Sequence, residues 1–169
     1  QYLLTHSFYA KLLAVKRVPS NKGKKTPGVD GVVWKGARAK WRAACSLRRR
    51  GYRPQPLSRI YIPKKNGQKR PHSIPNMTDR PQHASYKLAL APVAETTADG
   101  NSYGFRESHA CADAIQAAFN ALSKPNSAKW VFEADITGCY DNISKEWILD
   151  NIPMDKVVLR KWLDAGYVE

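Results

Sequence analysis

The chain has 169 residues, of which 43% are apolar, and a formal net charge of +14. Its length is sufficient to bury one hydrophobic core, and no apolar run approaches the ~18 residues that a membrane-spanning helix requires, so we expect no contact with a membrane. The first residues lack both an initiator methionine and a signal-peptide layout, and the three cysteines are widely spaced, so we expect part of a larger cytoplasmic protein with reduced thiols.

The positive charge is concentrated in the first half of the chain. Residues 1–80 hold 20 Lys and Arg against 2 acidic residues, whereas residues 81–169 hold 8 against 12, giving net charges of +18 and −4. A field of this strength attracts polyanions, and the release of counterions from phosphates makes such binding strongly salt-dependent. The first half therefore indicates a nucleic-acid partner; a basic surface without a partner is the alternative.

Two amphipathic helices are predicted in the first fifty residues. One covers residues 2–17, and the other covers residues 34–50, has a tryptophan-bearing face and ends at Gly51. Between them, residues 18–31 are too rich in Pro, Gly and Lys for a regular element, so we expect a basic loop closed by a turn at Pro27-Gly28. The apolar stripe of the first helix consists of Leu4, Phe8, Leu12 and Val15.

Cations of this loop and of the second helix are candidates for contacts with RNA phosphates. Solubility and pairing with the helix dipole explain the three consecutive arginines about as well. The candidates are Lys22, Lys24, Lys25, Arg48, Arg49 and Arg50.

A β-hairpin is predicted over residues 57–75. Ile60 and Ile62 alternate with polar or aromatic neighbours, and Asn66-Gly67 supplies the turn. Four cations crowd its tip, where they would reach a triphosphate or a nucleic-acid backbone; lysines that protect an exposed edge from aggregation are the alternative. These cations are Lys64, Lys65, Lys69 and Arg70.

The second half is predicted to contain four helices and one buried strand. The first helix is expected over residues 79–98, interrupted by Pro92, and the second over residues 108–122, where it should be well packed. A third helix is expected to end at Leu149, and a fourth to cover residues 155–165. The strand is expected over residues 129–134. The core of the first of these helices is expected to contain Tyr86, Leu88, Leu90 and Val93.

The predicted strand leads into D-I-T-G-C-Y-D-N-I, residues 135–143. A carboxylate at the carboxyl end of a strand is how polymerases hold Mg²⁺, which prefers oxygen ligands. A two-metal phosphoryl-transfer site needs more than one carboxylate, and no Asp-Asp pair occurs in the chain. A turn-forming or helix-capping role is the alternative for a lone Asp, and we assign such a capping role to Asp141.

Seven segments, in order, resemble the reverse transcriptases encoded by group II introns, which also act as splicing maturases. They are L-L-T-H-S-F-Y-A-K with A-V-K-R-V, T-P-G-V-D-G, S-L-R-R-R-G-Y-R-P-Q-P-L, R-I-Y-I-P-K-K-N-G-Q-K-R-P, P-V-A-E-T-T-A-D, N-S-Y-G-F-R and D-I-T-G-C-Y-D-N-I-S-K-E-W-I-L. Any one of them is weak alone, but together they run nearly end to end.

The resemblance implies an α+β fold, namely the fingers and the start of the palm of a right-hand polymerase. It is helix-rich with a basic β-hairpin and a short palm sheet. The implied domains are residues 1–128, the fingers with an N-terminal basic extension, and residues 129–169, the start of the palm. The chain departs from the family pattern at His83, where Gln is common.

The resemblance also implies roles for particular residues. Asp135 is the first catalytic metal ligand and the Ile136 carbonyl helps to hold Mg²⁺. Tyr140 lies under the sugar of the incoming nucleotide. Lys64 and Arg70 contact the triphosphate. Arg80 lies near the template. Lys65 and Lys69 are candidate RNA contacts because of their place at the cationic hairpin tip, independently of the resemblance.

Two interpretations of function remain open from the sequence. In the first, the chain is an inactive portion of an RNA-directed DNA polymerase whose complete form uses an RNA template, a DNA primer and deoxynucleoside triphosphates. In the second, the region serves mainly to bind intron RNA or to self-associate as a homodimer.

Overall fold

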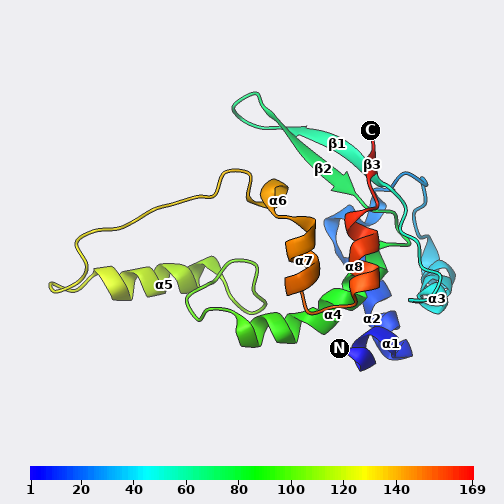
Figure 1. Cartoon of the computed structure of the whole chain (residues 1–169), viewed down its shortest axis with the longest axis horizontal. Helices are drawn as coiled ribbons and strands as arrows, with labels where there is room; N and C mark the ends of the chain where they lie inside the picture. The colour runs from blue at the N-terminus through cyan, green and yellow to red at the C-terminus, as the bar shows by residue number, and fades with distance from the viewer. The chain divides into compact units, whose positions relative to one another are not determined.

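The fold combines several helices with one small sheet, which confirms the predicted α+β class (Figure 1). The computed structural model describes residues 1–169 except for the side chain of Lys22. Among the described residues, no helix is both long enough and apolar enough to cross a membrane.

The chain forms two compact units. The first unit contains residues Gln1–Ala91 and Ser144–Glu169, and the second contains Pro92–Ile143. The helices of the first unit are α1 (Tyr2–His6), α2 (Phe8–Arg17), η1 (Val18–Ser20), η2 (Lys22–Lys25), α3 (Gly36–Ser46), α7 (Lys145–Asn151) and α8 (Lys156–Leu163). Its strands are β1 (Leu57–Pro63), β2 (Lys69–Ile74) and β3 (Tyr167–Val168), and α4 (Arg80–Thr97) begins in it and ends in the second unit.

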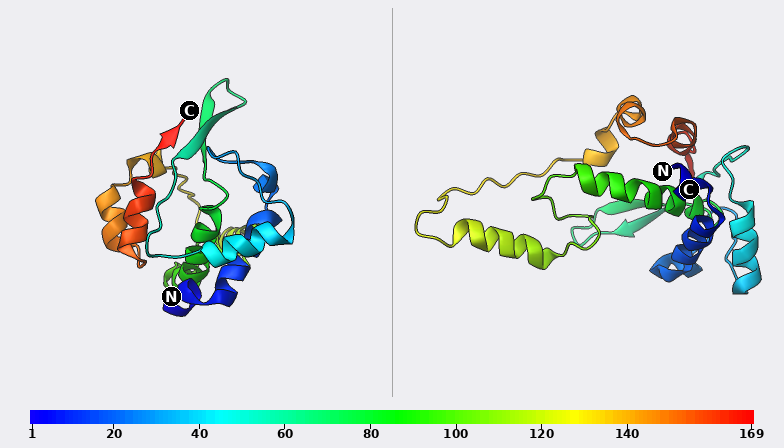
Figure 2. Two further views of the ribbon diagram at one scale, coloured as in Figure 1. Left: turned by 90° about the vertical axis from the view of Figure 1, so that its right-hand side faces the viewer. Right: turned by 90° about the horizontal axis from the view of Figure 1, so that it is seen from below.

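The N-terminal helices pack through small side chains. Ala14 and Val15 of α2 and Ala44 of α3 are buried, so the two helix backbones approach closely (Figure 2). The single helix predicted over residues 2–17 was wrong, because Ser7 has an extended backbone that ends α1 and precedes α2. Serine favours this position before a helix.

Helix α3 is shorter than predicted. It ends at Ser46, whose hydroxyl donates to the carbonyl of Ala43 at 2.9 Å. Leu47 then turns extended and is buried in the cluster with Val15 and Ala44. Burial of Leu47 therefore ends the helix before Gly51, and the three arginines follow the helix rather than forming its last turn.

A second core cluster joins α4 to the C-terminal helices. Tyr86 of α4 packs with Met154, Val158 and Leu159, and the ring of Trp162 meets Tyr86 edge-on with 5.3 Å between centroids. The side-chain oxygen of Asp155 accepts hydrogen bonds from the first N–H groups of α8, which confirms the predicted helix there. Of the core residues expected on α4, Tyr86 is buried, whereas Leu88, Leu90 and Val93 are half-buried.

The sheet has the order β2-β1-β3. Strands β1 and β2 form the predicted antiparallel hairpin, with Ile62 opposite Arg70 and Pro63 opposite Lys69. Strand β3, which the sequence did not predict, pairs in parallel with β1 through Tyr167 and Val168. The C-terminal end of the first unit therefore holds the base of the hairpin.

The second unit contains the end of α4, α5 (Cys111–Leu122) and α6 (Cys139–Asn142). The strand predicted over residues 129–134 was wrong, because these residues pair with no strand in the described part of the chain, and an extended segment becomes a strand only beside a partner. The expected packing of the helix over 108–122 was also wrong, since none of the residues of α5 is buried.

Candidate functional site

The hairpin presents four exposed cations at its tip. Lys64 and Lys65 lie in the turn, and Lys69 and Arg70 begin β2. The Lys64 N–H donates to the Gln68 carbonyl at 2.7 Å, and Gly67 has a φ of 80°, as the predicted turn requires. No described residue engages these four side chains, so their charges are available to an anion.

The base of the hairpin is held by contacts that the sequence did not reveal. The guanidinium of Arg59 lies 3.4 Å from the centroid of the Tyr167 ring, a cation–π contact. The hydroxyl of Tyr61 donates to the carboxylate of Glu169, which raises the pKa of Tyr61. In the sequence, the alternating pattern of β1 was the only signal that its side chains would find partners. These contacts fix the strand that carries the cationic tip.

The basic loop is anchored to the segment before α4. Gly28 lies so close to Asn76 that a Cβ would fall 2.0 Å from its side-chain oxygen, and the same oxygen accepts a 3.4 Å hydrogen bond from the Asp30 N–H. Lys24 and Lys25 are exposed. The predicted RNA contact of Lys22 lies outside the described residues.

Arg80 ties this loop down. Its guanidinium donates to the carbonyls of Gly23 at 3.0 Å, Thr26 at 2.6 Å and Pro75 at 3.0 Å. Burial lowers the pKa of Arg80. The geometry gives this residue a role in shaping the loop that bears Lys24 and Lys25, and its expected contact near the template stays a prediction.

The three consecutive arginines have different surroundings. Arg48 and Arg50 are exposed, whereas Arg49 forms a hydrogen-bonded ion pair with Asp155. The bond to Asp155 raises the pKa of the Arg49 guanidinium. Arg49 therefore joins the end of the α3 region to the start of α8, and Arg48 and Arg50 remain the more accessible candidates for RNA.

The Asp135 turn lies in the second unit and contains three predicted site residues within six positions of the sequence. Asp135 is exposed, as are Ile136 (73%) and Tyr140 (82%). Gly138 has a φ of 61°, and its carbonyl accepts from the Asn142 N–H at 3.2 Å and from the Asn142 side-chain amide at 2.9 Å. Ser144 caps α7 by accepting from the Trp147 N–H, while Asp141 lies inside α6 rather than capping it.

The donor set of this turn suits a hard cation only in part. The Asp135 carboxylate and the Ile136 carbonyl are oxygen donors, as Mg²⁺ prefers. Within the described residues, no ion pair engages Asp135, and no group of three or more His, Cys, Asp or Glu side chains is placed to hold a metal ion. The turn therefore presents two oxygen donors, and a role for them in binding Mg²⁺ stays a prediction.

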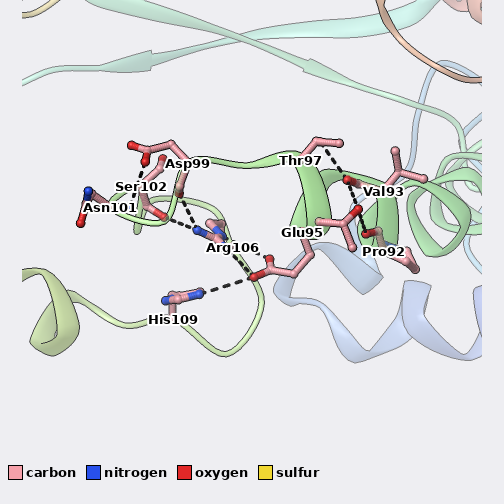
Figure 3. A network of polar contacts seen from close by, with 10 residues as sticks. Pro92, Val93, Glu95, Thr97, Asp99, Asn101, Ser102, Arg106 and His109 are labelled. Atoms are coloured by element: carbon pink, nitrogen blue, oxygen red, sulfur yellow. Dashed lines mark hydrogen bonds and ion pairs between the residues drawn. The ribbon is translucent and has the colours of Figure 1, made fainter.

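A second feature of the same unit organises the N-S-Y-G-F-R segment (Figure 3). The Arg106 guanidinium forms a bidentate pair with the Glu95 carboxylate and also donates to the carbonyls of Asp99 at 2.8 Å and Ser102 at 3.0 Å. The hydrogen bond from Arg106 lowers the pKa of Glu95. Arg106 thus folds the loop against the end of α4 and leaves the neighbouring Phe105 exposed, with a φ of 61°.

Two family models match the chain. The model described as the N-terminal domain of reverse transcriptase matches residues 1–47, and the model described as reverse transcriptase (RNA-dependent DNA polymerase) matches residues 62–167. The second match includes the cationic hairpin, Arg80 and the Asp135 turn.

Two curated relatives are similar to the chain. The group II intron-encoded protein LtrA of Lactococcus lactis subsp. cremoris is 32% identical over 181 residues, which cover 100% of this chain and 29% of LtrA. Protein YkfC of Escherichia coli (strain K12) is 31% identical over 156 residues, which cover 88% of this chain and 39% of YkfC. The chain spans less than half the length of either relative.

Proposed function

Since this chain belongs to the reverse transcriptase (RNA-dependent DNA polymerase) family, we propose that it forms the fingers and the start of the palm of a longer polymerase encoded by a group II intron. The family expected from the seven sequence segments is confirmed by the match over residues 62–167 and by the similarity to LtrA. The proposed protein acts in the cytoplasm, where it copies an RNA template from a DNA primer and binds its intron RNA as a maturase.

The observation that carries this proposal is the exposed, unpaired Asp135 in a turn with Tyr140, inside the region that the polymerase family model matches. Asp135 and the Ile136 carbonyl would hold Mg²⁺, which when bound supplies positive charge to developing phosphoryl oxygens. Tyr140 would lie under the sugar of the incoming nucleotide. Further carboxylates would come from another part of the longer protein.

The hairpin supports the nucleotide-binding half of the proposal. Lys64 and Arg70 would contact the triphosphate of the incoming deoxynucleotide, because their charges are exposed and uncompensated. Preplaced cations stabilise charge on transferred phosphoryl groups with little reorganisation. Lys65 and Lys69 would contact the RNA backbone beside them.

A pair of matched substitutions tests the catalytic assignment. In the longer protein, Asp135→Asn abolishes primer extension with Mg²⁺ and deoxynucleotides while leaving RNA binding intact. Asp141→Asn, in the adjacent helix α6 and also exposed, is the control and retains extension. Equal activity in both variants would remove Asp135 from the site. The 169-residue chain alone is expected to give no extension, because one carboxylate cannot clamp two metal ions.

RNA binding by residues 1–80 is tested with the chain itself. Its affinity for a labelled RNA hairpin should fall steeply with rising KCl concentration. Replacing Lys24, Lys25, Arg48 and Arg50 with Gln should weaken binding at low salt and flatten the salt dependence. Binding that is indifferent to salt would contradict this part of the proposal.

An exposed apolar surface in the second unit favours self-association as a second activity. Ile115 and Phe119, four positions apart on α5, are both exposed, as are Trp130 and Phe132 of the segment that follows. Exposed apolar side chains that gather on one surface mark interfaces. A homodimer would cover them. Light scattering should show a dimer that Phe119→Lys converts to monomer; a monomeric wild-type chain at high concentration would exclude this activity.

A further inference from the structure

An open groove of about 700 Å³ lies in the first unit, beside α8. Its apolar lining residues include two prolines, Pro54 and Pro56, together with Val157. Four cations, Arg53, Lys156, Arg160 and Lys161, and one carboxylate, Asp164, also line it. Three of these cations belong to the half of the chain whose net charge is negative, so the composition of that half gave no sign of them.

The positive charge of the four cations that line the groove is largely uncompensated. No described residue forms a hydrogen bond or ion pair with the guanidinium of Arg53 or Arg160. The charge of Arg160 does contribute to lowering the pKa of the Glu146 carboxyl group. Lys156 donates to carbonyls at the end of α7, including that of Ile152 at 2.7 Å, which leaves its charge unpaired. The carboxylate of Asp164 is already paired with Lys145 at 3.2 Å.

The segment next to Arg53 and helix α8, which both line the groove, are joined by hydrogen bonds. The ammonium of Lys161 donates to the Tyr52 carbonyl at 2.7 Å, and the Trp162 indole N–H donates to the Tyr52 hydroxyl at 3.0 Å. That hydroxyl in turn donates to the buried carboxylate of Asp79 at 2.9 Å. Arg53 and α8 are therefore held in a constant relation, and a ligand would meet a preorganised site.

The groove shares a lining residue with a second depression. A smaller pocket of about 200 Å³ is lined by Arg48 and also by Arg53. Arg53 thus lines both depressions, whereas Arg48 and Arg160 line one each. An extended polyanion offers phosphates to the cations of both depressions, whereas a single anion meets only one.

We propose that this groove binds the phosphodiester backbone of RNA and extends the RNA-binding surface from residues 1–80 onto α8. The proposal rests on the proposed function. Arg53 and Arg160 contact phosphates directly, while Lys156 and Lys161 keep their structural hydrogen bonds and add positive potential. The prolines and Val157 leave room for the sugar edges.

The test compares two double variants of the chain in binding a fluorescently labelled RNA hairpin over a KCl series. Arg53→Gln with Arg160→Gln should weaken binding at low salt by about tenfold or more and reduce the slope of log K against log[KCl] by about two. Lys124→Gln with Lys129→Gln removes the same charge from exposed positions of the second unit and should leave the slope unchanged. Arg53→Lys with Arg160→Lys should retain most of the slope.

The outcomes separate this proposal from the one on which it rests. Both arginines are exposed, so circular dichroism should show an unchanged fold. If the arginine-to-glutamine pair binds like the control while substitution of Lys24, Lys25, Arg48 and Arg50 weakens binding, the groove is not an RNA surface and the proposed function stands. If the wild-type chain shows no salt-dependent RNA binding, the proposed function fails as well.

Discussion

Gly28 is the point at which the basic loop touches the segment before α4. A Cβ there would lie 2.0 Å from the side-chain oxygen of Asn76 and 2.6 Å from its Cα. We expect Gly28→Ala to lower the free energy of unfolding by about 1–3 kcal/mol, because the backbone of Asn76 has to move. Urea denaturation measures this change.

Gly23 is the matched control for that experiment. It lies in the same loop, and a Cβ there would meet nothing within 4 Å. Gly23→Ala should therefore change the free energy of unfolding by less than about 0.5 kcal/mol. Equal losses in the two variants would mean that Gly28 is needed for loop conformation in general and not for its contact with Asn76.

His83 makes the stability of the first unit depend on pH. Burial lowers the pKa of its imidazole below the ordinary value of 6.5, and the charge of Asp79 opposes this in part. The unfolded chain therefore takes up a proton before the folded chain does. The free energy of unfolding should fall as pH drops from about 6.5 to the lowered pKa of His83. Above about pH 6.5 the imidazole is neutral in the folded and the unfolded chain, so it adds no pH dependence there.

The variant His83→Gln should lack this decline between about pH 7 and pH 5.5. The urea midpoint measured across that range reports it. His72→Gln, at an exposed position of β2, is the control and should decline as the wild type does. A decline that persists in His83→Gln would assign the pH dependence to another group.

The contacts of single residues separate what a local sequence pattern predicts from what only the folded chain shows. The family resemblance implied that Arg80 lies near the template, but its three carbonyl partners come from two separate segments, and only the folded chain brings them together. Arg49 is similar, because its partner Asp155 is 106 positions away. The local pattern at Gly67 was sufficient, since a φ of 80° depends on the turn itself.

At the scale of elements, Tyr52 links the segment before β1 to both α4 and α8. Its hydroxyl donates to Asp79 and accepts from Trp162. Tyr52→Phe should lower the free energy of unfolding by about 1–3 kcal/mol, because the buried carboxylate and the indole N–H each lose a partner. Thermal or urea denaturation measures the loss.

Tyr61→Phe is the control for this prediction. The Tyr61 hydroxyl also donates to a carboxylate, that of Glu169, but both residues are exposed. Water replaces the lost hydrogen bond there, so the change should stay within about 0.5 kcal/mol. A comparable loss in both variants would show that burial of the Tyr52 network contributes nothing.

The elements were predictable where their signals are local. The hairpin was found because alternation and Asn-Gly act over a few residues. The helix predicted over residues 155–165 corresponds to α8, and the structure adds that Asp155 caps it. The strand over 129–134 failed because a strand depends on a partner, and β3 was missed because two residues carry no periodicity. The end of α3 was misplaced because burial of Leu47 outweighs the glycine signal.

At the scale of the whole molecule, the two units should differ in their resistance to proteolysis. Trp130 and Phe132 are 93% and 92% exposed and lie in an extended segment without strand partners. Chymotrypsin should therefore cleave there first, since cleavage needs an accessible, unpaired backbone. Mass spectrometry of the early fragments identifies the site.

Trp41 serves as the internal comparison, because it is 55% exposed but lies within α3. It should be cut much later than Trp130. Early cleavage after Trp41 would show that exposure alone, rather than the lack of backbone pairing, decides the site of attack.

The candidate site was predictable to different degrees in the two units. The Asp135 turn and the hairpin tip are each contained in a short stretch of sequence, so their motifs made them candidates, and the roles of their residues stay predictions. The groove beside α8 joins residues 53–56 to residues 156–165, and no pattern in either stretch refers to the other. The net charge of each half of the chain also does not show where individual cations lie close together.

The pairing of β3 with β1 has a consequence for the order in which the chain folds. Strand β1 is synthesised about a hundred residues before its parallel neighbour Tyr167, and the cluster around Tyr86 waits equally long for Met154 and Val158. During that interval the ribosome adds the whole of the second unit while the first lacks its third strand and three buried residues of the cluster around Tyr86, namely Met154, Val158 and Leu159. The nascent chain therefore passes through a stage with an unprotected sheet edge, which is open to pairing with other chains until β3 is made.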